Sequence, residues 1–312
     1  MQYFSAFLFF LLSNEKKITF FFENGLLYVN FVNTCNFKVL NYMKRIIVLF
    51  LFGGLLSTHI CATDNLRIPD LRTLSIGGCG VTEVPLFNPA VLGTKTLSKI
   101  YASYYNRYSV NELATVNGGF YYVNDIMPTG IDITSFGYDE YRESLFRLSM
   151  GKQIARQWTI GIAIQYAMLQ SELFEDNSGR VSADLGITYR PVENLLTGLS
   201  VLHAPSIKVG DKNVENKHIA PYSVHLGFNW EVINTMLITG SISNSEEDSV
   251  NGSFGIEYMP FDDFKIRIGL KTSPLMPSLG VGYRLSGIDI DAGMIYHSVL
   301  GASMGLGLSF SF

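Results

Sequence analysis

Cysteine is scarce in this chain, with three residues among 312. Cys35 and Cys61 lie in an amino-terminal region that we expect to be removed during export, so Cys79 alone would remain. A single thiol cannot form an intramolecular disulfide, and its default role is that of a small apolar filler. A lipid anchor on Cys61 is an alternative, but the three residues before it are not the small residues that lipoprotein signals favour.

Charged residues are also few, at 16% of the chain, and their signs nearly balance, with 23 basic and 27 acidic residues. A nucleic-acid-binding protein needs lysine and arginine clustered on one face. The sequence has no such cluster, and we therefore exclude nucleic acid as a partner.

Motifs for catalysis or metal binding are missing. The five histidines are scattered without metal-ligand spacing, and neither a G-x-S-x-G nucleophile elbow nor a phosphate loop occurs. Asp289 and Asp291 share one strand face and could form a pair of catalytic carboxylates. Such a pair is more often neutralised by arginine, and Arg267 and Arg284 are candidates. We expect no enzyme, no metal and no cofactor.

Apolar runs long enough for a membrane helix do not occur after residue 62. Before it, the basic Met43-Lys44-Arg45 leads into an apolar run from Ile46 to Leu56, a length typical of the apolar core of a secretory signal. We therefore expect a signal peptide at 43–62, with cleavage after Ala62.

Residues 1–42 then precede the signal peptide, and they show no helical or strand period. We interpret them as upstream sequence translated from a misassigned start. The alternative is a transmembrane helix at Tyr3–Leu12, but that run has about half of the roughly 20 residues that a spanning helix needs.

The rest of the chain shows apolar residues alternating with small or polar ones, the pattern of β-strands. The last segment is the clearest, because Met304, Leu306 and Leu308 alternate with glycine and serine. Turn residues separate about fourteen such segments. They lie near 97–108, 115–124, 130–138, 144–153, 157–168, 180–190, 194–203, 221–232, 235–244, 250–259, 263–272, 277–285, 287–297 and 302–312.

The composition of the two faces predicts an all-β, antiparallel, up-and-down transmembrane barrel over residues 97–312. Its outer face would meet outer-membrane lipid, and aromatic residues near the strand ends, Tyr101, Tyr108, Trp158, Tyr166, Tyr189, Trp230, Tyr258 and Tyr296, would form the interfacial girdles. The scattered charges would face the lumen, and they are Asp184, Arg190, Glu257, Arg267, Arg284, Asp289 and Asp291. The alternative is a soluble secreted β-sandwich that acts as a binding module.

The segment before the strands carries a more specific motif. Gly77, Gly78 and Gly80 are followed by Asn88-Pro89-Ala90, and this arrangement resembles the hatch of the long-chain fatty-acid transporter (FadL) superfamily. The resemblance implies a fourteen-stranded barrel with residues 63–96 folded into its lumen as a hatch. Glycine permits positive φ and close backbone approach, which a hatch needs beside the wall.

Within that superfamily the chain resembles most the PorV and PorQ barrels of the Bacteroidetes type IX secretion system. The likeness is carried by Tyr189-Arg190-Pro191-Val192, Gly255-Ile256-Glu257-Tyr258 and the carboxyl-terminal Leu308–Phe312. It implies a non-enzymatic component of protein secretion, with secretion-system proteins as partners.

The alternative is a passive channel for small hydrophobic molecules, in which the hatch moves and the wall opens. A kink in an early strand would favour the channel, and Gly118-Gly119 is the candidate. Phe310 and Phe312 resemble the signal that the outer-membrane barrel-assembly machinery recognises.

Overall fold

The structure is a computed structural model that describes residues 10–11, 17–22, 25–30, 65–66, 70–172, 178–210, 219–246 and 250–312. The chain divides into two compact units, Met1–Leu51 and Phe52–Phe312. The first contains an antiparallel sheet of β1 (Phe10–Leu11), β2 (Lys17–Phe22) and β3 (Gly25–Asn30). These strands occur although the sequence has no strand period there, because aromatic and β-branched residues favour strands without alternation. The expected signal peptide at 43–62 lies outside the described residues.

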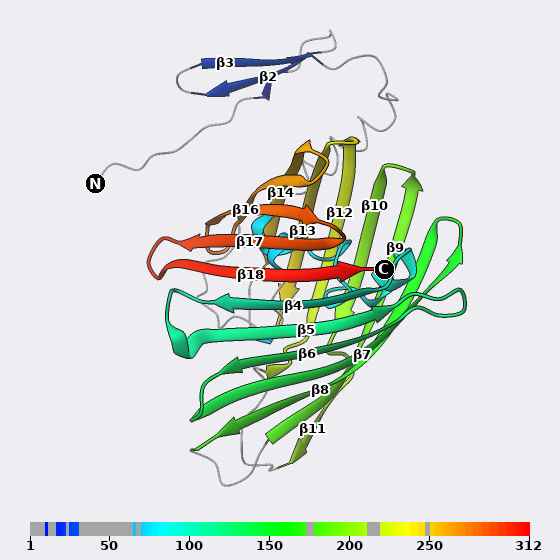
Figure 1. Ribbon diagram of the computed structural model, residues 1–312, viewed down its shortest axis with the longest axis vertical. Helices are drawn as coiled ribbons and strands as arrows, with labels where there is room; N and C mark the ends of the chain where they lie inside the picture. Colours follow the sequence, from blue (N-terminus) through cyan, green and yellow to red (C-terminus); the bar gives the residue numbers. More distant parts are fainter. Residues whose placement is uncertain are drawn as a thin grey trace. The chain divides into compact units, whose positions relative to one another are not determined.

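The second unit is a barrel (Figure 1). Its helical elements are α2 (Leu71–Ser75), η1 (Pro89–Thr94) and η2 (Asn111–Leu113). Its strands are β4 (Lys99–Asn106), β5 (Ala114–Tyr122), β6 (Thr129–Gly137), β7 (Tyr141–Ala155), β8 (Trp158–Ser171), β9 (Ser178–Val192), β10 (Leu195–Leu202), β11 (Ser206–Gly210), β12 (Ser223–Ile233), β13 (Met236–Ser245), β14 (Asn251–Phe261), β15 (Phe264–Lys271), β16 (Met276–Leu285), β17 (Ile288–His297) and β18 (Gly301–Ser311). In the described part of the chain, no helix has the length and apolarity needed to cross a membrane.

Antiparallel pairing closes the sheet. The strands from β4 to β10 and from β12 to β18 each pair with the next strand in sequence, β10 pairs with β12, and β18 pairs with β4. Fourteen of the described strands form this ring, and they match the fourteen predicted segments to within a few residues, which confirms the predicted barrel. The short β11 was not predicted; it continues β10 after a break and pairs with the first residues of β9.

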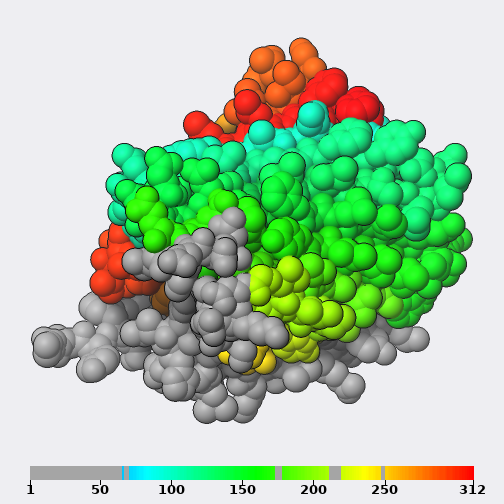
Figure 2. Space-filling view, turned by 90° about the horizontal axis from the view of Figure 1, so that it is seen from below, coloured from blue at the N-terminus to red at the C-terminus, as the bar shows by residue number. Residues whose placement is uncertain are grey.

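The two faces of the wall differ as the alternation predicted. On β18, the side chain of Leu306 is 62% exposed, whereas Ser309 is buried at 8%. On β15, Ile268 is exposed and Arg267 is buried. Figure 2 shows part of the outer surface, where the teal and green strands pack closely side by side. An apolar exterior around a polar interior is the pattern of a barrel in lipid and the reverse of a soluble sandwich, so the soluble alternative is wrong.

Two residues of the expected aromatic girdle depart from it, since Trp230 is buried at 8% and Tyr101 faces the lumen. Trp158, Tyr258 and Tyr296 are at least 40% exposed on the outside, but the Tyr101 hydroxyl donates to Asp132 in the lumen. The assignment of Tyr101 to the girdle was therefore wrong. Its parity on β4 explains this result, since the exposed Ile100 and Tyr104 occupy the even, outward positions.

The two ends of the barrel differ in their turns. At the end where β4 starts and β18 finishes, five of the turns between described strands have two residues, such as 156–157 and 262–263. Short turns are typical of the periplasmic side of an outer-membrane barrel. We call this the periplasmic end and the opposite one the extracellular end.

Candidate functional site

The hatch, of which residues 65–66 and 70–96 are described, lies in the lumen of the barrel; in Figure 1 its cyan elements lie among the strands. Its first helical turn, α2, starts at Asp70, whose carboxylate accepts a hydrogen bond from the Thr73 backbone N–H at 2.8 Å. This is an N-cap, and it satisfies one of the free donors at a helix start. Leu71 and Leu74 of the helix are buried beside the wall residues Tyr105 and Ile295.

The hatch glycines occupy positions that other residues would strain. Gly77 and Gly78 follow α2 with φ of +79° and +87°, in the left-handed region that glycine adopts without cost. At Gly80 the reason is space, because a β-carbon there would lie 2.5 Å from the Phe87 ring. The chain can thus leave α2 and cross the lumen within a few residues.

Asn88-Pro89-Ala90 fixes the next turn. The Asn88 side chain caps η1 by accepting from the Ala90 N–H at 3.0 Å, and its amide donates to the carbonyl oxygen of Ile187 in the wall at 3.2 Å. Pro89 stands at the first position of η1, where its missing N–H costs nothing. This motif therefore joins the hatch to β9.

The wall meets the hatch through a belt of lumen-facing glycines. At each of them a β-carbon would approach a hatch atom to 3.1 Å or less, so the absence of a side chain lets the hatch lie flat on the sheet. Several are directly paired across strands, for example Gly161 with both Gly151 and Gly186. Among the described strands the belt comprises Gly151, Gly161, Gly186, Gly198, Gly227, Gly255, Gly269, Gly280, Gly293 and Gly305.

A charged network links the hatch to the wall on one side. Arg72 of α2 pairs with Glu83 of the hatch and, at 2.8 Å, with Glu257 of β14. Arg267 of β15 pairs with the same Glu257 and with Asp291 of β17, each at 2.6 Å. Buried charges are tolerated when each one has a partner. This network therefore couples the position of α2 to three wall strands.

A second buried network lies in the opposite wall. Arg147 of β7 sits between Asp132, at 3.5 Å, and Asp184, at 3.1 Å, and all three side chains are fully buried. Asp132 also accepts hydrogen bonds from the hydroxyls of Tyr101 and Tyr121. These groups fill the space between β4 and β9 with bonded polar atoms.

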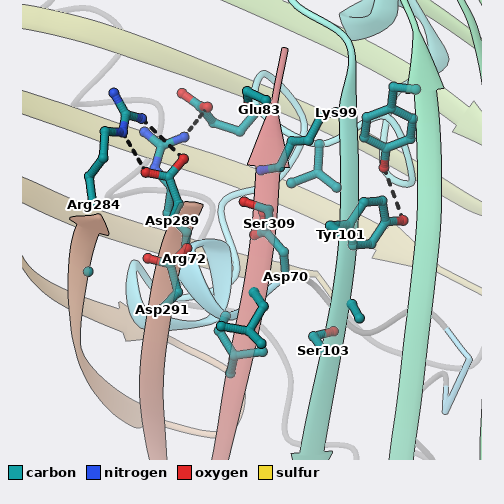
Figure 3. A pocket seen from close by; sticks show the side chains of 18 of the residues that line it. Asp70, Arg72, Glu83, Lys99, Tyr101, Ser103, Arg284, Asp289, Asp291 and Ser309 are labelled. Atoms are coloured by element: carbon teal, nitrogen blue, oxygen red, sulfur yellow. Dashed lines mark hydrogen bonds and ion pairs between the residues drawn. The ribbon is translucent and has the colours of Figure 1, made fainter. Parts of the chain in front are cut away.

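Six of the seven predicted lumenal charges fall into three groups. Glu257, Arg267 and Asp291 lie together in the first network, and Asp184 lies in the second. Arg284 pairs with Asp289 at 2.6 Å near the periplasmic end (Figure 3), where Arg284 is half exposed. Arg190 is not part of any of these groups; it lies at the periplasmic turn and donates to the Glu193 carbonyl oxygen at 3.0 Å.

Two cavities with charged residues in their lining open near the periplasmic end of the lumen. The first has a volume of about 330 Å³ and lies between α2 and strands β4, β15, β16, β17 and β18 (Figure 3). The second, of about 340 Å³, is bordered by β12, β13 and β14. Arg72, Glu83 and Lys95 border both cavities. The hatch therefore separates the two cavities.

Charges of the first cavity also act on the hatch. Burial raises the pKa of Asp70, but the nearby Lys99 and the hydrogen bonds from Thr73 lower it more, so that its pKa lies below its usual value. Asp70 is therefore a carboxylate at neutral pH. It is committed to capping α2 rather than to proton transfer.

The extracellular half of the lumen contains an apolar cluster. Val84, Leu86 and Phe87 of the hatch pack with Phe136, Leu145 and Leu169 of the wall and with Ile219 and Ala220 of the segment before β12. This cluster covers the extracellular side of the hatch, while the two cavities with charged residues in their lining lie on its periplasmic side.

Strand β5 is not kinked at Gly118-Gly119, the candidate position for a kink that would favour the channel. β5 pairs without interruption with both neighbours through these residues, and Gly119 instead leaves room for the Tyr101 ring. The irregularity lies between β10 and β11, where His203 has a φ of +59°. Its N–H donates to Asp184 at 2.8 Å, and its ring lies 3.0 Å from the Pro221 carbonyl oxygen.

Sequence reasoning missed three parts of this site. They are the glycine belt, the Arg147 network and the lysines of the first cavity. A signal existed for the belt, since almost every predicted strand carries a glycine on its polar face. The described residues hold no group of three or more histidine, cysteine or acidic residues placed to bind a metal ion.

Comparison with solved structures gives the fold a context. The toluene transporter TodX of Pseudomonas putida superimposes with a TM-score of 0.54 and 11% identity, covering 81% of this chain and 98% of TodX. A FadL homologue of Pseudomonas aeruginosa gives 0.52 and 11%, covering 79% and 98%. No family model and no curated protein matches the sequence. At this identity the likeness establishes the fold alone, a closed antiparallel barrel like those of these outer-membrane proteins, and nothing in it points to PorV or PorQ.

Proposed function

We propose that the protein is a non-enzymatic, plugged channel through which small hydrophobic molecules pass the outer membrane. The observation that carries this proposal is the two-sided hatch. It presents Phe87 and its apolar neighbours toward the outside and borders two cavities with charged residues in their lining toward the periplasm. TodX, with which the chain superimposes, is a toluene transporter and monoaromatic hydrocarbon channel, and this agrees with such a role.

The contacts between the hatch and the wall are compatible with movement of the hatch. Its backbone rests on the glycines of the belt, and the hatch side chains that pack against wall side chains, such as Leu71 and Phe87, are apolar. Its ion pair with the wall runs from Arg72 to Glu257. A solute that displaced Phe87 from Leu145 and Leu169 would exchange one apolar contact for another, at little net cost.

Uptake measurements test the proposal. Gram-negative host cells that lack their own hydrophobic channels would express the protein and receive labelled toluene or, as a control, labelled arabinose. We expect faster uptake of toluene and unchanged uptake of arabinose. Equal acceleration of both solutes would indicate a general pore, and no acceleration of toluene would refute the channel.

The role in type IX-like secretion is the second candidate, and it rests on the sequence resemblance. The structure gives it less support, because several extracellular turns are short, such as 138–140 and 298–300, and offer little surface to a protein partner. Deletion of the gene in its source organism separates the candidates. Loss of secreted proteins from the medium would support secretion, and slower growth on hydrophobic carbon sources would support the channel.

The assembly role of the carboxyl terminus also remains a proposal. Phe310 and Phe312 are exposed on the outside and stack with their ring centroids 5.8 Å apart. A side chain at this position is accessible to an assembly factor before insertion. Replacement of Phe312 by serine should lower the amount of barrel in the outer membrane without lowering synthesis.

A further inference from the structure

We propose that the first cavity contains a binding site for the carboxylate or phosphate group of a small anion, formed by Lys99, Lys265 and Ser309. Its place at the exit of the path rests on the proposed channel function. The binding site itself is argued from the cavity alone.

The cations that line this cavity divide into two groups. The three arginines are neutralised: Arg72 and Arg267 by the Glu257 network, and Arg284 by Asp289. The three lysines, Lys95, Lys99 and Lys265, have no carboxylate within ion-pair distance among the residues that the structure describes. Lysine ammonium groups that share a confined space without bound carboxylates attract an anion.

Lys95 has a weaker claim than the other two lysines. It belongs to the hatch, and its ammonium group donates at 3.0 Å to the carbonyl oxygen of Glu83. Lys99 and Lys265 belong to wall strands β4 and β15. They would stay in place if the hatch moved.

Ser309 is the independent observation that points to a ligand. This residue of β18 lines the cavity and is 8% exposed, and its hydroxyl has no hydrogen-bond partner within the described residues. A buried hydroxyl without a partner is costly. In Figure 3, Ser309 and Lys99 lie on the neighbouring strands β18 and β4, on the same side of the cavity. A hydroxyl donor next to an ammonium group suits an anionic oxygen.

The carboxylates that line the cavity do not fill this site. Asp70 caps α2, Glu83 is held by Arg72, Asp289 is held by Arg284, and Asp291 is held by Arg267. Asp263 lies at the exposed turn after β14. The volume of about 330 Å³ is at the lower end of the range for small-ligand sites. It suits a compact anion such as benzoate or phosphate better than a long acyl chain.

The site deepens the proposed function by adding a substrate class. A solute with an apolar body and a negative group would meet the apolar cluster first and the lysines last. The attraction at the exit would favour such a solute over a neutral hydrocarbon of the same size.

Binding would be measured by calorimetry on the purified full chain in a zwitterionic detergent, which removes anionic lipid headgroups as a source of the ligand. The probes are benzoate, its neutral analogue benzamide, and inorganic phosphate. We expect benzoate and phosphate to bind one site, more weakly as salt increases, and benzamide not to bind.

Three substitutions test which residues bind the anion. Lys99→Gln and Lys265→Gln should each weaken benzoate binding about tenfold, and Ser309→Ala about threefold, as expected for lost charge-assisted and neutral hydrogen bonds. Lys152→Gln is the matched control, since Lys152 is exposed and borders neither cavity. Heat-modifiable gel migration confirms that each variant is folded.

Three results would overturn the site. They are no binding of benzoate and phosphate to the folded protein, equal binding of benzamide, or unchanged affinity in both lysine variants. The proposed channel fails separately, because benzoate binding with no uptake of toluene or benzoate by cells would leave the site in place and remove the transport function.

Discussion

Gly255 of β14 lies so close to Ile76 of the hatch that a β-carbon on Gly255 would be 2.5 Å from the Ile76 carbonyl oxygen. The obstacle is backbone, which cannot turn away as a side chain could. The hatch can therefore occupy its position at Ile76 only because residue 255 of the wall has no β-carbon.

The substitution Gly255→Ala should displace the hatch from its position against the wall. Because the added methyl group meets the backbone of the hatch, we expect larger single-channel conductance in planar lipid bilayers than for the unmodified protein. Overpacking of this kind costs about 1–3 kcal/mol, so the barrel should still fold and remain heat-modifiable. Gly307→Ala is the control, since its β-carbon would be at an ordinary 3.5 Å from Leu71. Equal conductance of the two variants would show that the hatch does not rest on Gly255.

The barrel itself was predictable from the sequence because strand alternation repeats with period two. The same rule would have placed Tyr101 in the lumen, had it been applied strictly to β4. Alternation predicts whether a residue faces the lumen or the lipid, but not its position along the barrel axis. The sequence therefore predicted that the glycines of the belt face the lumen. It did not predict that they lie side by side, because this depends on the register between strands.

Two other features depend on contacts between distant segments. β11 was missed because its five residues follow His203-Ala204-Pro205, a stretch with the composition of a loop. The partners of Arg147 come from β6 and β9, and no local pattern joins them. The first cavity likewise is lined by residues from β4, β15 and the hatch. Only closure of the barrel brings these groups together.

Arg267 and Arg284 should differ sharply in their contribution to stability. Arg267 is 2% exposed and holds both Glu257 and Asp291, whereas Arg284 is half exposed. Removal of one partner of a buried ion pair costs about 3–5 kcal/mol, and removal of an exposed one costs about 0–1 kcal/mol. Denaturant titration of Arg267→Met and Arg284→Met in lipid vesicles would measure both. Similar losses would mean that the Arg267 network is hydrated.

Cys79 should resist thiol reagents in the folded barrel. Burial raises the pKa of its thiol to about 12, although hydrogen bonds with Ser241 and Thr239 oppose the shift, and the residue is 1% exposed. The reactive thiolate is therefore scarce at neutral pH. We expect no maleimide on the peptide that contains residue 79 until the protein is denatured. Ser286→Cys, at an exposed periplasmic turn, is the positive control, and labelling of both residues in the folded state would contradict the packing of the hatch.

The outward face of β18 makes the most direct test of the membrane assignment. Leu306 is 62% exposed and lies near the middle of the strand, so Leu306→Arg would place a charge in the lipid core at a cost of about 2–4 kcal/mol. The adjacent Gly307 faces the lumen, where a β-carbon meets Leu71 at 3.5 Å. Gly307→Ser adds only a small polar group there, and we expect it to cost much less. Both variants would be folded into vesicles and titrated with denaturant. If Leu306→Arg left the stability unchanged, or if Gly307→Ser lowered it as much as Leu306→Arg, the outward face of β18 would not contact lipid. In lipid, the buried charge of the arginine should cost much more than the small hydroxyl of the serine in the lumen.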